Sequence, residues 1–248
     1  MPISMVRTMV TDPAVSPHAV PAAGPATAGG ALLRMLQLAS PALPVGAYAY
    51  SQGLEAAVEL GLVRDEPATG SWLRGLLGHG LAYLDLPVLA RLWAAHHAAD
   101  THAARRWNGV LLASRETREL RGEERDLGAA MARLCRDLGV PLAVDGKDRT
   151  CTFASGFAAA ACHWGVEQRG TLTAYAWSWL ENQVAAAQRL VPIGHTAGQR
   201  ILLSLGAALD AAVDCGLTLI DDQLGAAAPG QIFSSMHHER QHTRLFRS

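Results

Sequence analysis

The sequence predicts an all-α protein, with a single globular, bundle-like helical domain spanning residues 30–235. Apolar residues recur three and four positions apart in every segment long enough to assign, which is the period of an amphipathic helix. The alternation of apolar and polar residues that marks a half-buried strand is absent from the 248-residue sequence. Half of the residues are hydrophobic and only 17% are charged, so one domain can bury a sizeable core.

Two terminal segments are expected to lie outside this domain. Residues 1–29 are rich in Ala, Pro, Gly and Thr, and we expect a disordered arm because such a segment cannot build a core. Residues 236–248 hold a lone Leu245-Phe246 pair among polar and basic residues. This segment is expected to be a flexible, partner-binding tail that is mobile in the free protein.

The first two helices are separated by a compact turn. The first helix ends near Ser40, because Pro41 disfavours helical geometry in the residue before it. The second helix is predicted to run from about Ala47 to Gly61, where the glycine is suited to the position just after a helix end.

N-terminal signals mark several of the later helices. Asp65, Asp85 and Asp100 each precede a segment with helical spacing of apolar residues, and each is a candidate cap, with Thr101 as the alternative to Asp100. Thr171 is the predicted cap of the next long helix. A capping box that begins at Thr196 predicts the start of the last one.

Composition argues against several classes of protein. The net charge is −1 without a basic stripe, so nucleic-acid binding has no electrostatic basis. Charged residues such as Arg74 and Asp85 interrupt the most apolar region, so no membrane span is predicted. The prolines of the arm exclude a signal-peptide core. The four cysteines form no CxxC pair and indicate buried, reduced thiols, so we expect a cytoplasmic protein.

Motifs for catalysis are also missing. The sequence contains no phosphate-binding loop, and no GxSxG, HExxH or GxGxxG motif in a suitable context. No catalytic residue, cofactor site or metal site is therefore predicted. A helical enzyme with an unrecognised site remains an alternative.

The most polar stretch runs from Ser114 to Asp126, where acidic and basic residues nearly balance. One interpretation is a solvated helix face held by ion pairs three and four residues apart, each contributing about 0.2–0.5 kcal/mol. The other is a surface that binds a partner. The sequence leaves both open.

Five blocks of the sequence resemble, in register, the UreF family of urease accessory proteins, over roughly residues 31–248. They are Leu38 to Glu55 (LASPALPVGAYAYSQGLE), Ser114 to Leu120 (SRETREL), Trp177 to Gln183 (WSWLENQ), Val191 to Thr196 (VPIGHT) and Arg244 to Ser248 (RLFRS). The chain departs from the family pattern at His195, where Gln is usual.

The resemblance implies a helical, homodimeric and non-catalytic urease maturation factor. Such a protein bridges the UreD/UreH scaffold subunit and the GTPase UreG, so that nickel reaches apo-urease in a GTP-dependent step. The C-terminal segment is expected to engage the scaffold subunit. The expected partner-binding residues lie in three of the blocks: Tyr48, Ser51, Gln52 and Glu55; Arg115, Glu116, Arg118 and Glu119; Arg244, Phe246 and Arg247.

A rival hypothesis is a nickel carrier that binds the metal directly through histidines near the C-terminus. His238 and His242 are four residues apart and could share one face of a helix. Imidazole is a suitable ligand for Ni²⁺. Two histidines alone are a weak constellation, so the maturation factor is the preferred hypothesis.

Overall fold

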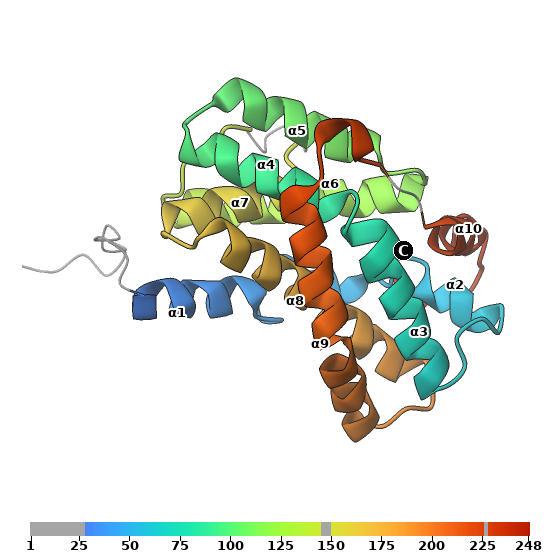
Figure 1. Ribbon diagram of the computed structural model, residues 1–248. Helices are drawn as coiled ribbons and strands as arrows, with labels where there is room; N and C mark the ends of the chain where they lie inside the picture. The colour runs from blue at the N-terminus through green and yellow to red at the C-terminus, as the bar shows by residue number, and fades with distance from the viewer. Residues whose placement is uncertain (1–27, 145–149, 226–227) are drawn as a thin grey trace, which may run out of the picture.

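The computed structural model describes residues 28–144, 150–225 and 228–248, and within these ranges it contains helices and no strand, which confirms the all-α prediction. The elements, labelled in Figure 1, are α1 (Ala28–Ala39), η1 (Ala47–Ala49), α2 (Leu54–Glu59), α3 (Glu66–Leu76), η2 (Leu77–Leu81), α4 (Asp85–His97), α5 (Thr101–Ala113), α6 (Arg118–Asp137), α7 (Phe153–His163), α8 (Gln168–Leu190), α9 (His195–Thr218), η4 (Asp221–Gln223) and α10 (Pro229–His238).

Helix α4 lies at the centre of the fold and packs against α5, α7, α8 and α9. It is apolar on most of its circumference, as a helix enclosed by others must be. Small residues let its neighbours approach closely. At Gly216 of α9, a β-carbon would lie 2.6 Å from the Leu86 Cβ, so a larger residue would push α9 away from α4.

Helix α9 is long and apolar enough to cross a membrane by length and composition, a property that the sequence analysis did not predict. In the structure Leu205, Leu209 and Val213 are buried in the core. Helix α9 packs against α8, α4 and α3. The apolar character of this helix is therefore used, at least on this face, for packing inside the fold.

Several predicted helix starts are confirmed and others are displaced. Asp85 is not a cap, because α4 begins at Asp85 itself and Leu84 occupies the capping position. The side chains of Asp65 and Asp100 accept hydrogen bonds from the backbone N–H groups of the third following residues, as caps do. Thr171 is not a cap, because α8 already begins at Gln168 and the threonine hydroxyl bonds back to the Glu167 carbonyl. Helix α9 begins at His195 and has no side-chain cap.

The prediction of one continuous second helix is wrong, because the helix is interrupted between η1 and α2. Gln52 and Gly53 adopt positive φ angles of 55° and 83° there. A β-carbon at Gly53 would lie 2.9 Å from the Ser235 backbone nitrogen, so α10 packs directly on this glycine. Gly61 lies just after the end of α2 with φ 73°, as predicted.

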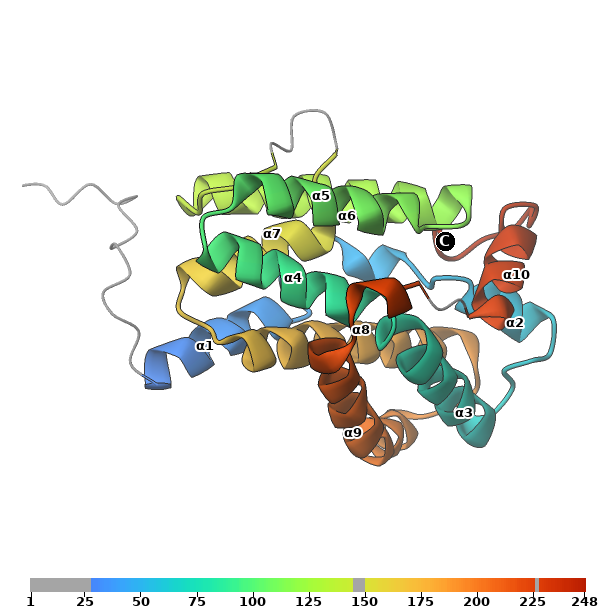
Figure 2. The ribbon, with the colours of Figure 1, turned by 45° about the horizontal axis from the view of Figure 1, so that its top comes forward.

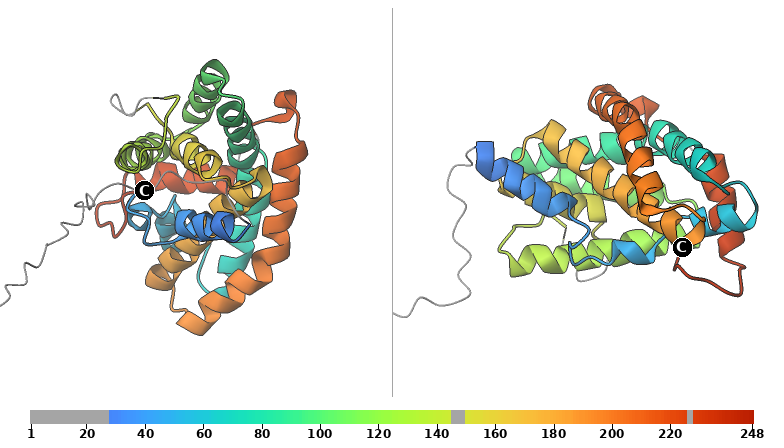
Figure 3. Two further views of the ribbon diagram at one scale, coloured as in Figure 1. Left: turned by 90° about the vertical axis from the view of Figure 1, so that its left-hand side faces the viewer. Right: turned by 90° about the horizontal axis from the view of Figure 1, so that it is seen from below.

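The predicted flexible tail is also corrected. Helix α10 continues through His238, past the expected domain boundary at residue 235, and the remaining residues fold back past α2 towards α6 (Figures 2 and 3). Of the predicted disordered arm, residues 1–27 lie outside the described residues, while residues 28 and 29 belong to α1.

Candidate partner-binding site

The C-terminal tail is docked by its backbone along the break between η1 and α2. The Arg247 N–H donates to the Ala49 carbonyl at 2.8 Å, and the Ser51 N–H donates to the Ser248 carbonyl at 2.8 Å. The Ser51 hydroxyl makes a second, short hydrogen bond to the same carbonyl. Ser248 is fully buried, so the end of the tail belongs to the folded structure.

Phe246 anchors the tail in an apolar pocket and is only 4% exposed. The Arg189 guanidinium lies over its ring, 4.9 Å from the ring centroid, in a cation–π contact. The buried residues of the pocket come from α2, the segment after it, α8 and the loop after α8: Leu54, Ala57, Val63, Ala186, Ala187 and Val191. The aromatic ring that the sequence suggested as a partner anchor is therefore inserted into its own fold.

The Glu55 carboxylate of α2 fixes the backbone in front of this ring. It accepts hydrogen bonds from the N–H groups of Leu245 and Phe246, at 2.7 and 2.8 Å. It also lies 3.2 Å from Nε2 of His238. A carboxylate that receives backbone N–H donors is an effective anchor because charge-assisted hydrogen bonds are stronger than neutral ones.

His238 is completely buried between two carboxylates, with Nδ1 2.7 Å from Glu119 and Nε2 3.2 Å from Glu55. A neutral imidazole carries one N–H and can donate to only one of them. Glu119 also accepts a hydrogen bond from Arg244 Nη1 at 2.7 Å, and Glu55 accepts hydrogen bonds from two backbone N–H groups. Both carboxylates therefore act as acceptors. We call this cluster of Glu55, Glu119, His238 and Arg244 the clasp.

Beside the clasp, Glu123 of α6 accepts hydrogen bonds from Gln52 Nε2 at 2.7 Å and from the Ser248 hydroxyl at 2.8 Å. No cation pairs with it among the described residues. Burial raises the pKa of Glu123 to about 7, although these two hydrogen bonds oppose the shift. Gln52 in turn accepts from Trp179 Nε1 at 2.8 Å, which links the break after η1 to α8.

Arg115 forms a second buried ion cluster with Asp85 of α4 and Glu124 of α6. Its Nη2 contacts Glu124 at 2.6 Å and makes a short contact with Asp85. Burial alone would lower the pKa of Arg115, but the two carboxylates outweigh it and the pKa is raised. Glu124 also accepts the Phe153 N–H at 2.9 Å, at the start of α7. This cluster joins α4, α6 and α7.

A cavity of about 280 Å³ is lined by Arg115 and Glu123. Its remaining walls are largely apolar and come from α1, the loop after it, η2, α6 and α8. Among the described residues, no group of three or more His, Cys, Asp or Glu side chains is arranged to hold a metal ion.

The structure brings some of the predicted residues together and separates others. Ser51, Gln52, Glu55, Glu119, Arg244 and Phe246 meet at the docked tail. Arg115, whose side chain is 17% exposed, pairs with the buried carboxylates of Asp85 and Glu124. The remaining four predicted residues are exposed: Tyr48, Glu116, Arg118 and Arg247. Whether any of them contacts a partner stays a prediction.

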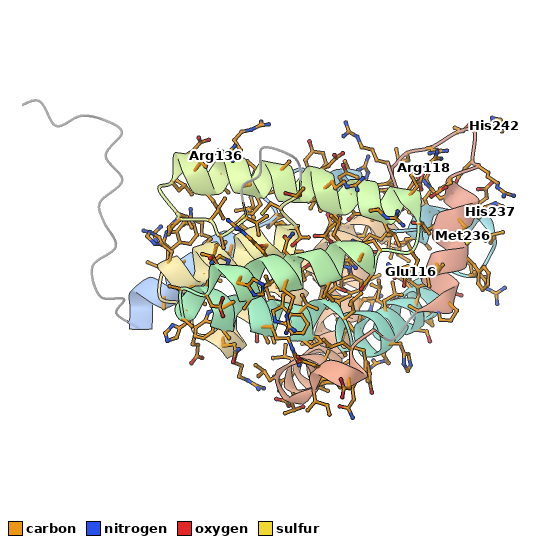
Figure 4. All side chains as sticks on the ribbon, turned by 90° about the horizontal axis from the view of Figure 1, so that it is seen from above. Glu116, Arg118, Arg136, Met236, His237 and His242 are labelled. Atoms are coloured by element: carbon orange, nitrogen blue, oxygen red, sulfur yellow. The ribbon has the colours of Figure 1, made fainter. Side chains whose placement is uncertain are left out.

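The two interpretations of the polar stretch each describe part of it. Glu116 and Arg118 are exposed at the α10 end of α6, whereas Glu123 and Glu124 are buried (Figure 4). Glu123 was not predicted as a site residue, because both interpretations placed the charges of this stretch at the surface. A signal was present, since Glu123 and Glu124 follow Leu120 by three and four residues and so share its buried helix face.

The C-terminal histidines do not share a helix face. His238 is the last residue of α10, and both of its ring nitrogens face carboxylates. His242 lies beyond the end of α10, in the exposed part of the tail (Figure 4). The geometry on which the nickel-carrier hypothesis relied is therefore not present.

Comparisons with known proteins agree with the resemblance. The UreF family profile matches residues 63–206. A protein named urease accessory protein UreF from Alkalilimnicola ehrlichii is 47% identical over 221 residues, which cover 89% of this chain and 97% of that protein. Proteins of the same name from Pseudomonas putida strain W619 and Chromohalobacter salexigens are 48% and 47% identical over 219 and 218 residues. Each alignment covers 88% of this chain. The alignments cover 98% of the Pseudomonas protein and 95% of the Chromohalobacter protein.

Proposed function

This chain belongs to the UreF family of urease accessory proteins, and from this premise we propose that it is a cytoplasmic, non-catalytic urease maturation factor. In this proposal it bridges the UreD/UreH scaffold subunit and the GTPase UreG. Nickel is then the cargo that passes to apo-urease in a GTP-dependent step, and this chain contributes binding surfaces to the complex.

The observation that carries the proposal is the exposed apolar face of α10. Phe233 and Met236 are three residues apart on this helix and are 68% and 50% exposed. Leu245 of the adjoining tail is 52% exposed. Large apolar side chains held at the surface by a rigid support are typical of protein interfaces. We assign this face to the scaffold subunit.

The clasp and the contacts beside it supply the rigid support. Glu239 accepts the N–H groups of Arg118 and Glu119 at 2.9 and 3.2 Å, so the end of α10 is tied to the first turn of α6. Thr117 and Ser235 share a buried hydrogen bond of 2.8 Å at the same junction. The tail residues therefore act mainly by positioning α10, and a preformed surface binds with less loss of conformational entropy.

A second apolar face lies at the other end of the molecule from α10, on α1 (Figure 2). Leu32, Leu33 and Leu36 are 51%, 68% and 56% exposed there, while Leu38 is buried towards the core. We assign this face to a second copy of the chain, because an apolar stripe on one helix can pair with itself across a two-fold axis. Apolar faces at opposite ends suit a protein that joins several partners.

Co-purification with the UreD/UreH subunit tests the assignment of α10. Phe233→Ser with Met236→Ser should weaken binding at least about tenfold, since each removes a large apolar contact. Leu203→Ser is the matched control, because Leu203 is 85% exposed on α9, a different helix. Urease activation in cells should fall with the double variant only. Unchanged binding by the double variant would remove α10 from the interface.

A further inference from the structure

An open depression of about 560 Å³ lies between the η1 segment, α6 and the tail, apart from the clasp. Three arginines line it. Arg133 and Arg136 come from α6, three residues apart, and Arg247 comes from the tail. We call this depression the basic pocket. Tyr48, Tyr50 and Asp126 also line it.

The three guanidinium groups differ from a set of arginines that form ion pairs within the fold. Arg91, Arg115, Arg169, Arg200 and Arg244 are all paired with carboxylates. The side chains of Arg133, Arg136 and Arg247 are exposed, and within residues 28–144, 150–225 and 228–248 none has an ion-pair or hydrogen-bond partner. A chain of net charge −1 thus concentrates three unpaired positive charges around one depression.

The frame of the basic pocket is rigid. Gly46 opens the η1 turn with φ 81°, a left-handed conformation that favours glycine. Tyr50 is 5% exposed, and its hydroxyl donates to Asp126 at 3.0 Å, which joins η1 to α6. The Arg247 backbone bonds to Ala49, so the third arginine is brought to the pocket only when the tail is docked.

We propose that the basic pocket binds an acidic segment of a partner protein. Guanidinium groups match carboxylates in geometry and bind them through paired hydrogen bonds. Tyr48, 70% exposed at the rim, adds the kind of aromatic contact that protein interfaces use. The inference does not depend on which protein supplies the segment, nor on the assignments made for α10 and α1.

Two other anionic ligands fit the pocket less well. A free phosphate group is usually held by converging backbone N–H groups at a helix N-terminus, whereas Arg133 and Arg136 lie in the C-terminal part of α6. Nucleic acid requires a basic stripe longer than three residues in one depression. An acidic peptide needs only a few carboxylates spaced to meet the three arginines.

The test uses the full chain and a fluorescent hexaglutamate peptide as the probe, followed by anisotropy, with a hexaglutamine peptide for comparison. The expected result is saturable binding of the acidic peptide that weakens as salt rises, because exposed charges are screened. Arg133→Glu with Arg136→Glu should weaken binding at least about tenfold. Arg247→Gln should weaken it less, because one guanidinium is removed without reversing a charge.

Arg64→Glu with Arg240→Glu is the matched control, since both arginines are exposed and neither lines the basic pocket. This control makes the same change in net charge and should bind the peptide nearly as the natural sequence does. Circular dichroism verifies that each variant is folded. Equal loss in the control, or no saturable binding of hexaglutamate, would overturn the proposal. Inorganic phosphate that displaces the peptide at similar concentration would replace it with a small-anion site.

Discussion

The imidazole of His238 lies 3.2 Å from the carboxylate of Glu55, although 183 residues separate them in the sequence. Glu55 uses the same carboxylate to hold the backbone of the tail, so this contact joins α10, α2 and the C-terminal segment. The imidazole of His238 is thus central to how the proposed scaffold-binding face is supported.

Replacing His238 with Ala should destabilise the protein by about 3 kcal/mol or more, because the two carboxylates would lose their shared hydrogen-bond partner and a fully buried ring would leave a cavity. The free energy of unfolding measured with urea checks this. His237→Ala is the neighbouring control, since His237 is exposed, and it should change stability by less than about 0.5 kcal/mol. Equal stability of the two variants would mean that His238 does not hold the clasp.

Phe246 and Leu245 provide a test of tail docking at adjacent positions. Phe246→Ala should cost about 3 kcal/mol, since the ring is 4% exposed in an apolar pocket. Leu245→Ala should have little effect on stability, because Leu245 is 52% exposed. Limited proteolysis should cut the tail faster only in the Phe246 variant. A tail that is cut equally fast in the natural sequence would restore the flexible-tail prediction.

Glu123 should make stability depend on pH near neutrality. Its pKa is raised from 4.5 to about 7, so the folded protein binds this proton more tightly than the unfolded chain does. Its contribution therefore favours folding at low pH and is lost as pH rises from about 4.5 to about 7, by roughly 3 kcal/mol in total.

Glu123→Gln should remove this dependence on pH. The free energy of unfolding of the variant, taken relative to that of the natural sequence, should therefore be higher at pH 8 than at pH 5. Urea unfolding at both pH values measures the difference. Glu116→Gln, at an exposed position on the same stretch, should leave the pH profile unchanged. A parallel pair of profiles for Glu123→Gln and the natural sequence would contradict the raised pKa.

Arg115 and Arg118 belong to the same sequence block and should behave differently. Arg115→Met leaves Asp85 and Glu124 buried without a cation and should cost about 3–5 kcal/mol. The side chain of Arg118 is 82% exposed, so Arg118→Met should change stability by less than about 0.5 kcal/mol. Thermal unfolding compares them. Similar losses would place both residues in one structural network.

Self-association through α1 is tested by sedimentation. The natural sequence should form a species of about twice 26.2 kDa at micromolar concentration. Leu33→Ser with Leu36→Ser should shift it to the monomer with the helical content retained, because both side chains are more than half exposed. A dimer that survives this change would place the interface elsewhere.

Local features of the fold were predictable from the sequence. The caps at Asp65 and Asp100 were identified correctly because each bonds to a backbone N–H only three residues away. The break between η1 and α2 was missed because it depends on a distant element. Gly53 is required where α10 meets the chain, and the local pattern around residue 53 is helical throughout.

The helical class, the periodicity of the core and the similarity to the UreF family were predictable from the amino-acid sequence alone. Which charged side chains are withdrawn from solvent depends on how distant segments pack together. Glu55, Glu119 and Glu123 are polar in sequence and were assigned to partner contacts or to the surface. Their burial depends on His238, Arg244 and Ser248, which lie 119 to 183 residues away. A charge can be buried only where compensating groups converge on it, and that convergence is a property of the folded chain.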